Sequence, residues 1–158
     1  MSIKIGDQVP DVSVKTKDAE GIQTLQTADI LKDKKVVLFA VPGAFTPTCS
    51  ETHLPGFVVN VDAIKAKGVD TIACTSVNDV FVMDAWGKSQ NAEHILMLAD
   101  GNADLAKALG LTLDGTGFGM GLRSKRYAMI INNGVVEHIA VDEKGLESSA
   151  AEAILKAL

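Results

Sequence analysis

Apolar residues form two continuous runs in the first half of the chain, and each run ends at a turn signal. Residues 35–41 read KVVLFAV before Pro42-Gly43, and residues 69–77 read VDTIACTSV. Strands that are buried on both faces have such runs, whereas strands with one exposed face alternate. The two runs therefore predict central strands of a sheet. A shorter strand is expected at residues 95–99.

Between these runs the apolar residues recur with the period of an amphipathic helix. The first such stripe consists of Leu54, Phe57, Val58, Val61 and Ile64. It predicts a helix that ends at Gly68. Further helices are expected at residues 79–86, after an Asn78 or Asp79 cap, and at 103–109, before Gly110. A last helix is expected from Ser149, whose spacing to Glu152 is that of a capping box.

Two strands joined by a tight turn are expected before the last helix. Residues 127–131 and 135–141 flank Asn132-Asn133-Gly134, a sequence typical of a hairpin. The elements then alternate between strand and helix until the hairpin. This order indicates an α/β fold with a mixed central sheet flanked by helices, because a hairpin adds antiparallel strands. Without repeats or linkers, residues 1–158 are expected to form one domain.

The amino-acid composition limits which binding partners and which cellular location are expected for this protein. The chain has 158 residues, 47% of them hydrophobic, and a net charge of −5. That charge argues against a nucleic-acid partner or a polybasic membrane contact. The apolar runs are too short to span a bilayer, and the N-terminus has no apolar signal region. Two cysteines suggest a reduced, cytoplasmic protein without a disulfide framework.

The segment that is richest in candidate chemistry is VPGAFTPTCSE, residues 41–51, between the first strand and the first helix. Sites in α/β sheets gather at such loops. Cys49 is expected in the first turn of that helix, where free N–H groups and the helix dipole favour an anion. Ionising most of an ordinary thiol at pH 7 requires roughly 3 kcal/mol, which exceeds what a helix terminus supplies. A cation is therefore expected nearby. Pro55 predicts a bend or an irregular turn in the helix.

The neighbourhood of Cys49 leaves several interpretations open. A lone intracellular cysteine is commonly a small, inert core residue. The polar neighbours Thr46, Thr48 and Ser50 favour a reactive thiol instead. His53 lies four positions later and shares a helix face with Cys49. It could contribute to a metal site, act as a base for the thiol or be an ordinary surface histidine, although two ligands alone do not make a zinc site.

Other candidate motifs carry less chemistry. Cys74 lies in the middle of the second apolar run, where packing is the favoured role. No Cys-x-x-Cys pair is present, which counts against a dithiol oxidoreductase of the thioredoxin type. The glycine-rich residues 115–121 lack the spacing of a nucleotide-binding loop and predict a tight or flexible loop.

The pattern Pro42-x-x-x-Thr46-x-x-Cys49 resembles the active-site motif of the peroxiredoxins. The wider run PGAFTPTCS, followed by HLPGF and SVND, is similar to the atypical or type II group, which is peroxiredoxin 5-like. The similarity continues through residues 121–127 to the last helix and so covers nearly the whole chain. It implies a thioredoxin-like fold and a thiol peroxidase for hydrogen peroxide and organic hydroperoxides that uses no metal, haem or flavin.

The resemblance also implies a role for each matching residue. Cys49 matches the peroxidatic cysteine, which becomes a sulfenic acid. Thr46 matches the hydroxyl that binds thiolate and peroxide, and Pro42 matches the residue that shields the pocket. Backbone N–H groups near Thr48 and Cys49 match those that hold the peroxide oxygens. Arg126 matches the arginine that supplies the missing cation.

Three cations lie close together at this point, so charge alone does not select Arg126. Without the resemblance, Arg126 is most simply a solvated charge at a strand end. Strand alternation places Arg126 on the opposite face from Lys125, and Arg126 directly precedes the apolar run. Arg123 lies further back, behind a glycine-rich segment. We therefore expect Arg126, rather than Arg123 or Lys125, beside Cys49.

The resemblance also indicates which thiol reduces the sulfenic acid and which oligomeric state the protein has. No cysteine follows Cys74, whereas some members of the group carry a resolving cysteine near the C-terminus. The pair Cys49 and Cys74 resembles the plant-like type II proteins, in which glutathione or glutaredoxin commonly reduces the sulfenic acid. Thioredoxin is the alternative reductant, and Cys74 is the alternative resolving residue. A non-covalent homodimer is implied. A non-enzymatic redox sensor that signals peroxide through Cys49 is the alternative function.

Overall fold

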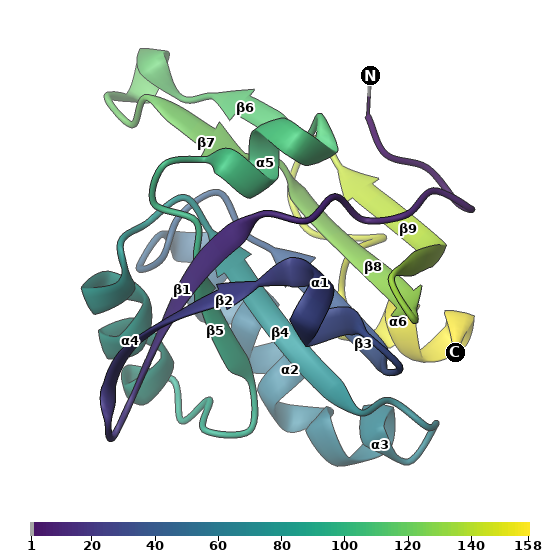
Figure 1. The fold of residues 1–158 in the computed structure, drawn as a ribbon. Helices are drawn as coiled ribbons and strands as arrows, with labels where there is room; N and C mark the ends of the chain where they lie inside the picture. The colour runs from purple at the N-terminus through teal and green to yellow at the C-terminus, as the bar shows by residue number, and fades with distance from the viewer. Residues whose placement is uncertain (1) are drawn as a thin grey trace.

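Seven strands form one mixed sheet in the order β2-β1-β5-β4-β3-β8-β9, in a computed structural model that describes residues 2–158 (Figure 1). The three strands β3, β4 and β5 run parallel, and the others are antiparallel to their neighbours. The strands of this sheet are β1 (Ser13–Asp18), β2 (Gly21–Gln26), β3 (Lys35–Ala40), β4 (Thr71–Ser76), β5 (Leu96–Ala99), β8 (Arg126–Asn132) and β9 (Val135–Asp142). A separate pair consists of β6 (Thr112–Asp114) and β7 (Leu122–Ser124).

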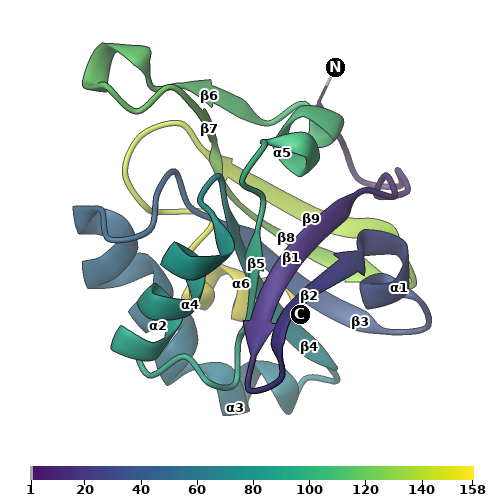
Figure 2. The same cartoon turned by 60° about the vertical axis from the view of Figure 1, so that its left-hand side comes forward.

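Helices cover both faces of the sheet, as Figure 2 shows. One face packs against α2 (Leu54–Val59), α3 (Val61–Lys65), α4 (Val80–Ser89) and α6 (Ala151–Ala157). The other face packs against α1 (Thr27–Leu31) and α5 (Asp104–Leu109). A π-helical turn, η1 (Cys49–His53), precedes α2, and a 3₁₀ turn, η2 (Thr116–Phe118), lies between β6 and β7. Within residues 2–158, no helix is long and apolar enough to cross a membrane.

Side chains of the central strands alternate between two cores. In β8, Ala128 and Ile130 enter the core under α2 and α4, whereas Tyr127 and Met129 enter the core on the α1 side. Arg126 begins the strand and shares the parity of Ala128, so it belongs to the α2 face. Strands β3 and β4 are buried along nearly their whole length. This burial confirms the reading of the two apolar runs as central strands.

Several local predictions are confirmed. Asp79 caps α4, because its Oδ1 accepts a hydrogen bond from the Val82 N–H at 2.9 Å. Gly110 ends α5 in the left-handed conformation, with φ of 71°. Asn133 and Gly134 form the two-residue turn between β8 and β9 with φ of 48° and 82°. Such a turn matches the right-handed twist of the paired strands.

The helix expected to end at Gly68 is divided into shorter pieces. A π-helical turn comes first, α2 ends at Val59, and α3 begins at Val61. Asn60 lies between the two helices with φ of −100° and ψ of 9°, and its amide donates to the Gly56 carbonyl. The apolar stripe continues through this break because both helices pack on the same core. Hydrophobic periodicity therefore did not reveal it.

The predicted capping box at Ser149 is wrong. The last helix begins at Ala151, and its N-cap is Ala150. The Ser149 hydroxyl instead donates to Asp142 Oδ2 at 2.6 Å. The Ser149 side chain is thus bound to a carboxylate at the end of β9 instead of accepting from a helix N–H, and the helix starts later than predicted.

The N-terminal hairpin and the small β6–β7 sheet had no clear signal in the sequence. Strands β1 and β2 lie at an edge of the sheet, and much of each strand is exposed. Strands β6 and β7 have three residues each. Short, partly polar strands provide too few positions for a periodic pattern.

The cap of α4 gives a direct test of the fold. Asp79→Ala should lower the free energy of unfolding by about 1 kcal/mol, because the Val82 N–H loses its acceptor. Urea unfolding followed by circular dichroism measures this loss. Glu93→Ala, at an exposed loop position, is the control and should change stability by less than about 0.5 kcal/mol. Equal stability of the two variants would contradict the cap.

Candidate functional site

The loop that follows β3 holds the start of the Cys49 turn in a constrained conformation. Phe45 has φ of 63°, a value that bulky residues rarely adopt. A Cβ added to Gly43 would lie 3.1 Å from the Thr46 side chain, so the loop is closely packed there. The Ala44 N–H donates to Asn78 Oδ1 at 3.0 Å, which ties this loop to the segment after β4. The backbone that precedes Cys49 is thus fixed from both sides.

Cys49 lies in the first turn of the helical segment, as predicted. The Ser50 N–H donates to the Thr46 carbonyl at 2.9 Å, which leaves the N–H groups of Thr48 and Cys49 outside the ladder of the helix. The turn from Cys49 is π-helical, and the Leu54 N–H donates back to the Cys49 carbonyl. Pro55 follows immediately and has no N–H to continue an α-helical ladder. The irregular turn expected from Pro55 therefore forms just before it.

A buried guanidinium lies beside the thiol. Arg126 Nη2 is 3.2 Å from Cys49 Sγ, and both side chains are almost completely buried. This contact forms because strand alternation directs the Arg126 side chain to the face of the sheet on which Cys49 lies. Within residues 2–158, no carboxylate forms a salt bridge with Arg126. Its charge is therefore not neutralised by an acid and acts on the sulfur.

The other two cations of this segment are engaged elsewhere. Arg123 donates from Nε to the Met120 carbonyl at 2.8 Å and from Nη1 to the Val77 carbonyl at 3.2 Å. Lys125 pairs with Glu143 at 3.1 Å in a partly exposed position. Arg126 is the cation that the fold places against Cys49.

His53 is buried and holds the far side of the guanidinium. Its Nδ1 is 2.7 Å from Arg126 Nη1, and its Nε2 is 3.1 Å from the Ser149 carbonyl. Its ring packs against Phe39 and Phe57, with centroid distances of 5.1 Å and 5.7 Å. Burial lowers the pKa of His53 to about 4, and the Arg126 charge lowers it as well. The surface interpretation of His53 is wrong, since only 1% of the residue is exposed.

Asp142 organises the segment that contains Ser149. Its carboxylate accepts hydrogen bonds from the N–H groups of Glu147, Ser148 and Ser149, and from the hydroxyls of both serines. Burial raises the pKa of Asp142, but these hydrogen bonds, led by that of the Ser149 hydroxyl, lower it by more. A charged carboxylate therefore fixes the carbonyl that meets His53.

The remaining predicted residues lie in the loop before Cys49. Thr46 donates its hydroxyl to the Gly43 carbonyl at 2.6 Å, and its side chain is half-buried. Pro42 and Thr48 are half-buried as well, on either side of Phe45 along the chain. The sequence pattern thus places these three residues around one loop, with the Thr46 donor directed at the backbone.

Cys74 lies in the centre of β4, fully buried and paired in register with Phe39 of β3. Its side chain belongs to the same core as Cys49, and both thiols are free. Burial raises the pKa of Cys74 well above its ordinary value, and the proximity of Cys49 adds to the effect. Cys74 is therefore a protonated core residue, in agreement with its apolar neighbours.

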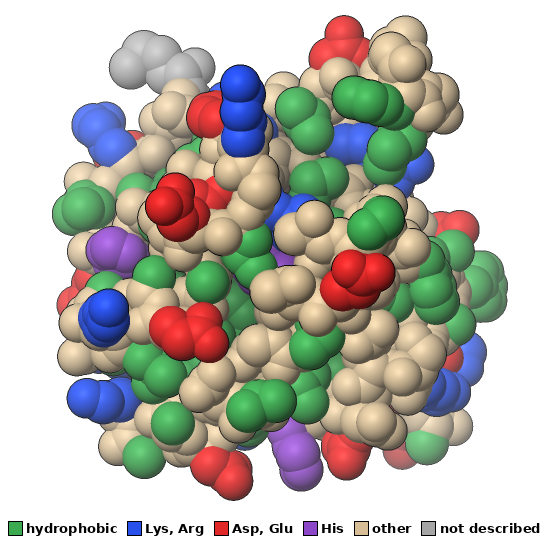
Figure 3. All heavy atoms as spheres, turned by 180° about the vertical axis from the view of Figure 1, so that it is seen from behind, with side chains coloured by type: hydrophobic (Ala, Val, Ile, Leu, Met, Phe, Trp, Pro, Cys, Tyr) green, Lys and Arg blue, Asp and Glu red, His purple; other side chains and the backbone are tan. Residues whose placement is uncertain are grey.

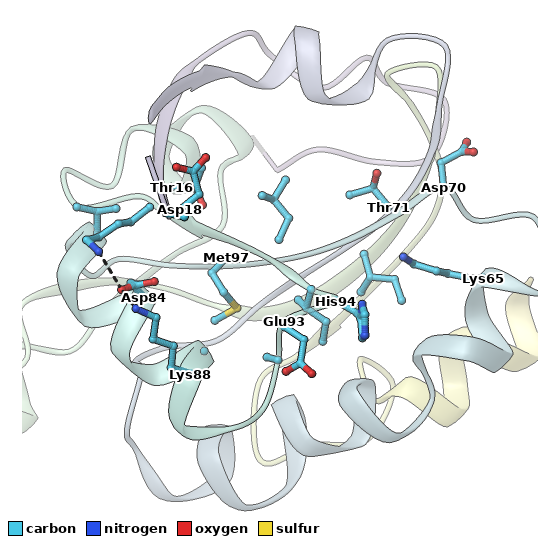
Figure 4. Close-up of a pocket in the computed structure, with 18 residues that line it drawn as sticks. Thr16, Asp18, Lys65, Asp70, Thr71, Asp84, Lys88, Glu93, His94 and Met97 are labelled. Atoms are coloured by element: carbon cyan, nitrogen blue, oxygen red, sulfur yellow. Dashed lines mark ion pairs between the residues drawn. The ribbon is translucent and has the colours of Figure 1, made fainter. Parts of the chain in front are cut away.

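No other centre competes with this one. Among the described residues, no three His, Cys, Asp or Glu side chains converge as metal ligands. A hollow of about 870 Å³ lies beside β5 and the end of α4 (Figure 4), where Asp84 pairs with Lys17 and Lys88. Both acidic and basic side chains line this hollow, and Cys49 does not. Acidic and basic side chains are also intermixed on the face that Figure 3 shows.

Sequence reasoning missed two parts of the site. Asp142 and the backbone of Ser149 had no motif to identify them, although the acid and serine residues near the end of β9 were visible. The contact of the Trp86 indole N–H with Ser50 Oγ at 2.9 Å was missed as well. It joins α4 to the π-helical turn and could be found only from the packing.

Comparisons with known proteins agree on one family. Residues 4–155 match the model of the Redoxin family. Peroxiredoxin-2D of Arabidopsis thaliana is 46% identical, over 99% of this chain and 98% of that protein. Reduced Prx3 of Vibrio vulnificus in complex with H₂O₂ is 58% identical, with a TM-score of 0.95 and coverage of 98% of both chains. Peroxiredoxin 5 of Alvinella pompejana is 36% identical, with a TM-score of 0.87 and coverage of 98% and 97%.

The pKa of His53 makes stability depend on pH. The folded chain holds His53 neutral down to about pH 4, whereas its ordinary pKa is 6.5. The unfolded chain therefore binds the proton first, and stability should fall as the pH drops from 6.5 towards 4. The loss should reach roughly 3 kcal/mol.

Urea unfolding at a series of pH values measures this loss. His53→Asn has no titrating ring and should lack that part of the slope, whereas the exposed His94→Asn should keep it. Parallel pH profiles of the wild type and His53→Asn would show that His53 titrates normally in the folded chain.

Proposed function

The chain belongs to the Redoxin family, as a peroxiredoxin of the type II, peroxiredoxin 5-like group, and we propose that it reduces peroxides through the thiolate of Cys49. The proposed substrates are hydrogen peroxide and organic hydroperoxides. The observation that carries the proposal is the guanidinium of Arg126, which forms no salt bridge with a carboxylate of residues 2–158 and lies 3.2 Å from the buried sulfur of Cys49. A thiolate in the first turn of a helix completes this arrangement. Its scaffold is a thioredoxin-like fold.

The reaction follows from a thiolate and a weak O–O bond. The Cys49 sulfur attacks the hydroxyl oxygen of the peroxide, so that an S–O bond forms while the O–O bond breaks. The leaving oxygen departs with the electron pair and takes up a proton to become water or an alcohol. The sulfur is oxidised to a sulfenic acid, and the peroxide is reduced.

Arg126 acts on both partners of this step. Its charge favours the thiolate over the thiol, because it lies within hydrogen-bond distance in a buried setting. In the transition state it also stabilises the negative charge that moves onto the leaving oxygen. The free N–H groups near Thr48 and Cys49 supply further donors, and Pro42 shields the sulfur from water. We assign the hydroxyl of Thr46 to orient the peroxide, which requires it to turn from the Gly43 carbonyl.

External thiols complete the cycle in this proposal. Two thiols convert the sulfenic acid of Cys49 back to a thiol, yielding one disulfide and one water. We propose glutathione or a glutaredoxin as the source, because no cysteine follows Cys74 and Cys74 is protonated in the core. The buried position of Cys49 requires its turn to open for this step. A homodimer in the cytoplasm and one domain over residues 1–158 complete the proposal.

Substitution of Arg126 tests the reaction. Arg126→Ala should slow peroxide reduction by about three orders of magnitude, since it removes the cation from thiolate and transition state. Arg126→Lys keeps the charge but has no planar fork to reach Cys49 and His53 together, so it should recover less than about a tenth of the rate. Stopped-flow measurement of the peroxide reaction across pH gives these rates.

Arg123→Ala is the matched control for lost charge and should cost less than about tenfold, because the hydrogen bonds of Arg123 go to the backbone carbonyls of Met120 and Val77 and not to Cys49. Equal losses for Arg123→Ala and Arg126→Ala would refute the assignment. Slow, single-turnover consumption of peroxide by the wild type with every thiol reductant would indicate a redox sensor instead of a peroxidase.

Steady-state turnover with different thiols tests the reductant. We expect robust peroxide consumption with glutathione and glutaredoxin, and Cys74→Ser should retain most of it because Cys74 is buried in β4. Turnover with thioredoxin and its reductase is the comparison. Activity with thioredoxin alone, or loss of most activity in Cys74→Ser, would assign the resolving role to Cys74 or to another partner.

A further inference from the structure

We propose that His53 is a positioning residue, a neutral hydrogen-bond acceptor that the Asp142-anchored turn locks in place so that Arg126 faces Cys49. The inference rests on the proposed peroxide reaction and adds to it a residue that does not touch the reacting atoms. It also separates His53 from the roles of base and metal ligand, since the ring nitrogens of His53 face Arg126 and Ser149.

The two contacts of His53 determine where its proton lies. A guanidinium carries only donors, so the 2.7 Å contact with Arg126 requires an unprotonated Nδ1. A backbone carbonyl only accepts, so the 3.1 Å contact with Ser149 requires a proton on Nε2. Both contacts are satisfied by one species, the neutral imidazole with Nε2–H. The low pKa of His53 agrees with this species.

A neutral acceptor suits this position better than a carboxylate. Arg126 is buried and needs a partner for Nη1 if Nη2 is to remain directed at Cys49. A carboxylate would satisfy the guanidinium but would also neutralise the charge that the thiolate requires. The imidazole satisfies the hydrogen bond and leaves the charge available. Stacking of Phe39 on Phe57, 3.9 Å apart and nearly parallel, supports one side of the His53 ring.

Asp142 couples this arrangement to the sheet. Asp142 ends β9 and pairs in register with Arg126, which begins β8. The hydrogen bonds that Asp142 accepts from residues 147–149 fix the Ser149 carbonyl beside Nε2 of His53. One register pair of the sheet thus contains both Arg126 and Asp142, the residue that fixes the Ser149 carbonyl against His53. The relay runs from Asp142 through Ser149 and His53 to Arg126, and ends at Cys49.

Three substitutions of His53 separate positioning from simple packing. His53→Asn keeps a neutral acceptor on Cγ, as in the imidazole, and should react with hydrogen peroxide within about fivefold of the wild type. His53→Leu keeps volume without an acceptor and should react about 10- to 100-fold more slowly. His53→Asp adds a charged acceptor and should raise the pH midpoint of Cys49 alkylation by about one unit or more.

The measurements are stopped-flow rates with hydrogen peroxide and the pH dependence of iodoacetamide alkylation, with Cys49 identified by mass spectrometry. Asp142→Asn, which replaces one of the two accepting oxygens of the anchor and removes its charge without changing His53, should lower the rate in the same direction as His53→Leu but less. His94→Asn is the matched control, an exposed histidine outside the site, and should behave as the wild type. Urea unfolding of every variant identifies those that are only unstable.

The outcomes distinguish the inference from the proposed function. Failure of the wild type to react with peroxide would refute the proposed function. A reactive wild type with an unchanged rate in folded His53→Leu, or with equal alkylation profiles of His53→Asp and His53→Asn, would overturn the positioning role alone. If His53→Leu does not fold, the comparison of His53→Asn with His53→Asp and Asp142→Asn decides.

Discussion

The site depends on one buried positive charge, that of Arg126, with which no carboxylate among residues 2–158 forms a salt bridge. Burying an unpaired guanidinium costs several kcal/mol, so the surrounding structure must supply neutral acceptors and exclude better partners. Arg126 meets this requirement with two contacts, to Cys49 Sγ and to His53 Nδ1. Of these two partners, the Cys49 sulfur is the one whose interaction with the guanidinium becomes stronger when it ionises to a thiolate. The burial of Arg126 and the reactivity proposed for Cys49 are thus two aspects of the same interaction.

The sheet makes this arrangement rigid. Strand β8 lies between β3 and β9, and Arg126 pairs with Asp142 of β9 directly before Tyr127, where the pairing with β3 begins. Strand β3 leads into the loop that carries Cys49, and β9 ends at Asp142. Three neighbouring strands therefore supply the thiol, the cation and the anchor of the acceptor. Small displacements among them are resisted by the two packed cores.

The thiol itself sits on a less regular element. Phe45 has a positive φ, and η1 replaces an α-helical turn at Cys49. Irregular backbone costs energy and is tolerated where neighbouring contacts hold it. Here Asn78 accepts a hydrogen bond from the Ala44 N–H of the loop, and Trp86 of α4 donates one to Ser50 of the turn. The thiol for which we propose reduction by an external thiol is thus placed on an irregular turn outside the sheet.

Local sequence determined the central strands, the helix ends at Asp79 and Gly110, the hairpin and the first-turn position of Cys49. These features depend on residues a few positions apart, so periodicity, caps and turn chemistry reveal them. Strand alternation also selected Arg126 over Lys125. Strands β1, β2, β6 and β7 were not predicted: β6 and β7 have only three residues each, and β1 and β2 are largely exposed and polar.

The functions of His53, Ser149 and Asp142 were decided only by the tertiary structure. Arg126 and Cys49 are 77 positions apart, and His53 and Ser149 are 96 positions apart. No local pattern specifies such pairs, since the sheet order brings them together. The capping box at Ser149 failed because the carboxylate of Asp142, at the end of β9, binds the hydroxyl of Ser149. Sequence set which residues could react, and long-range packing decided which proton and which charge each of them holds.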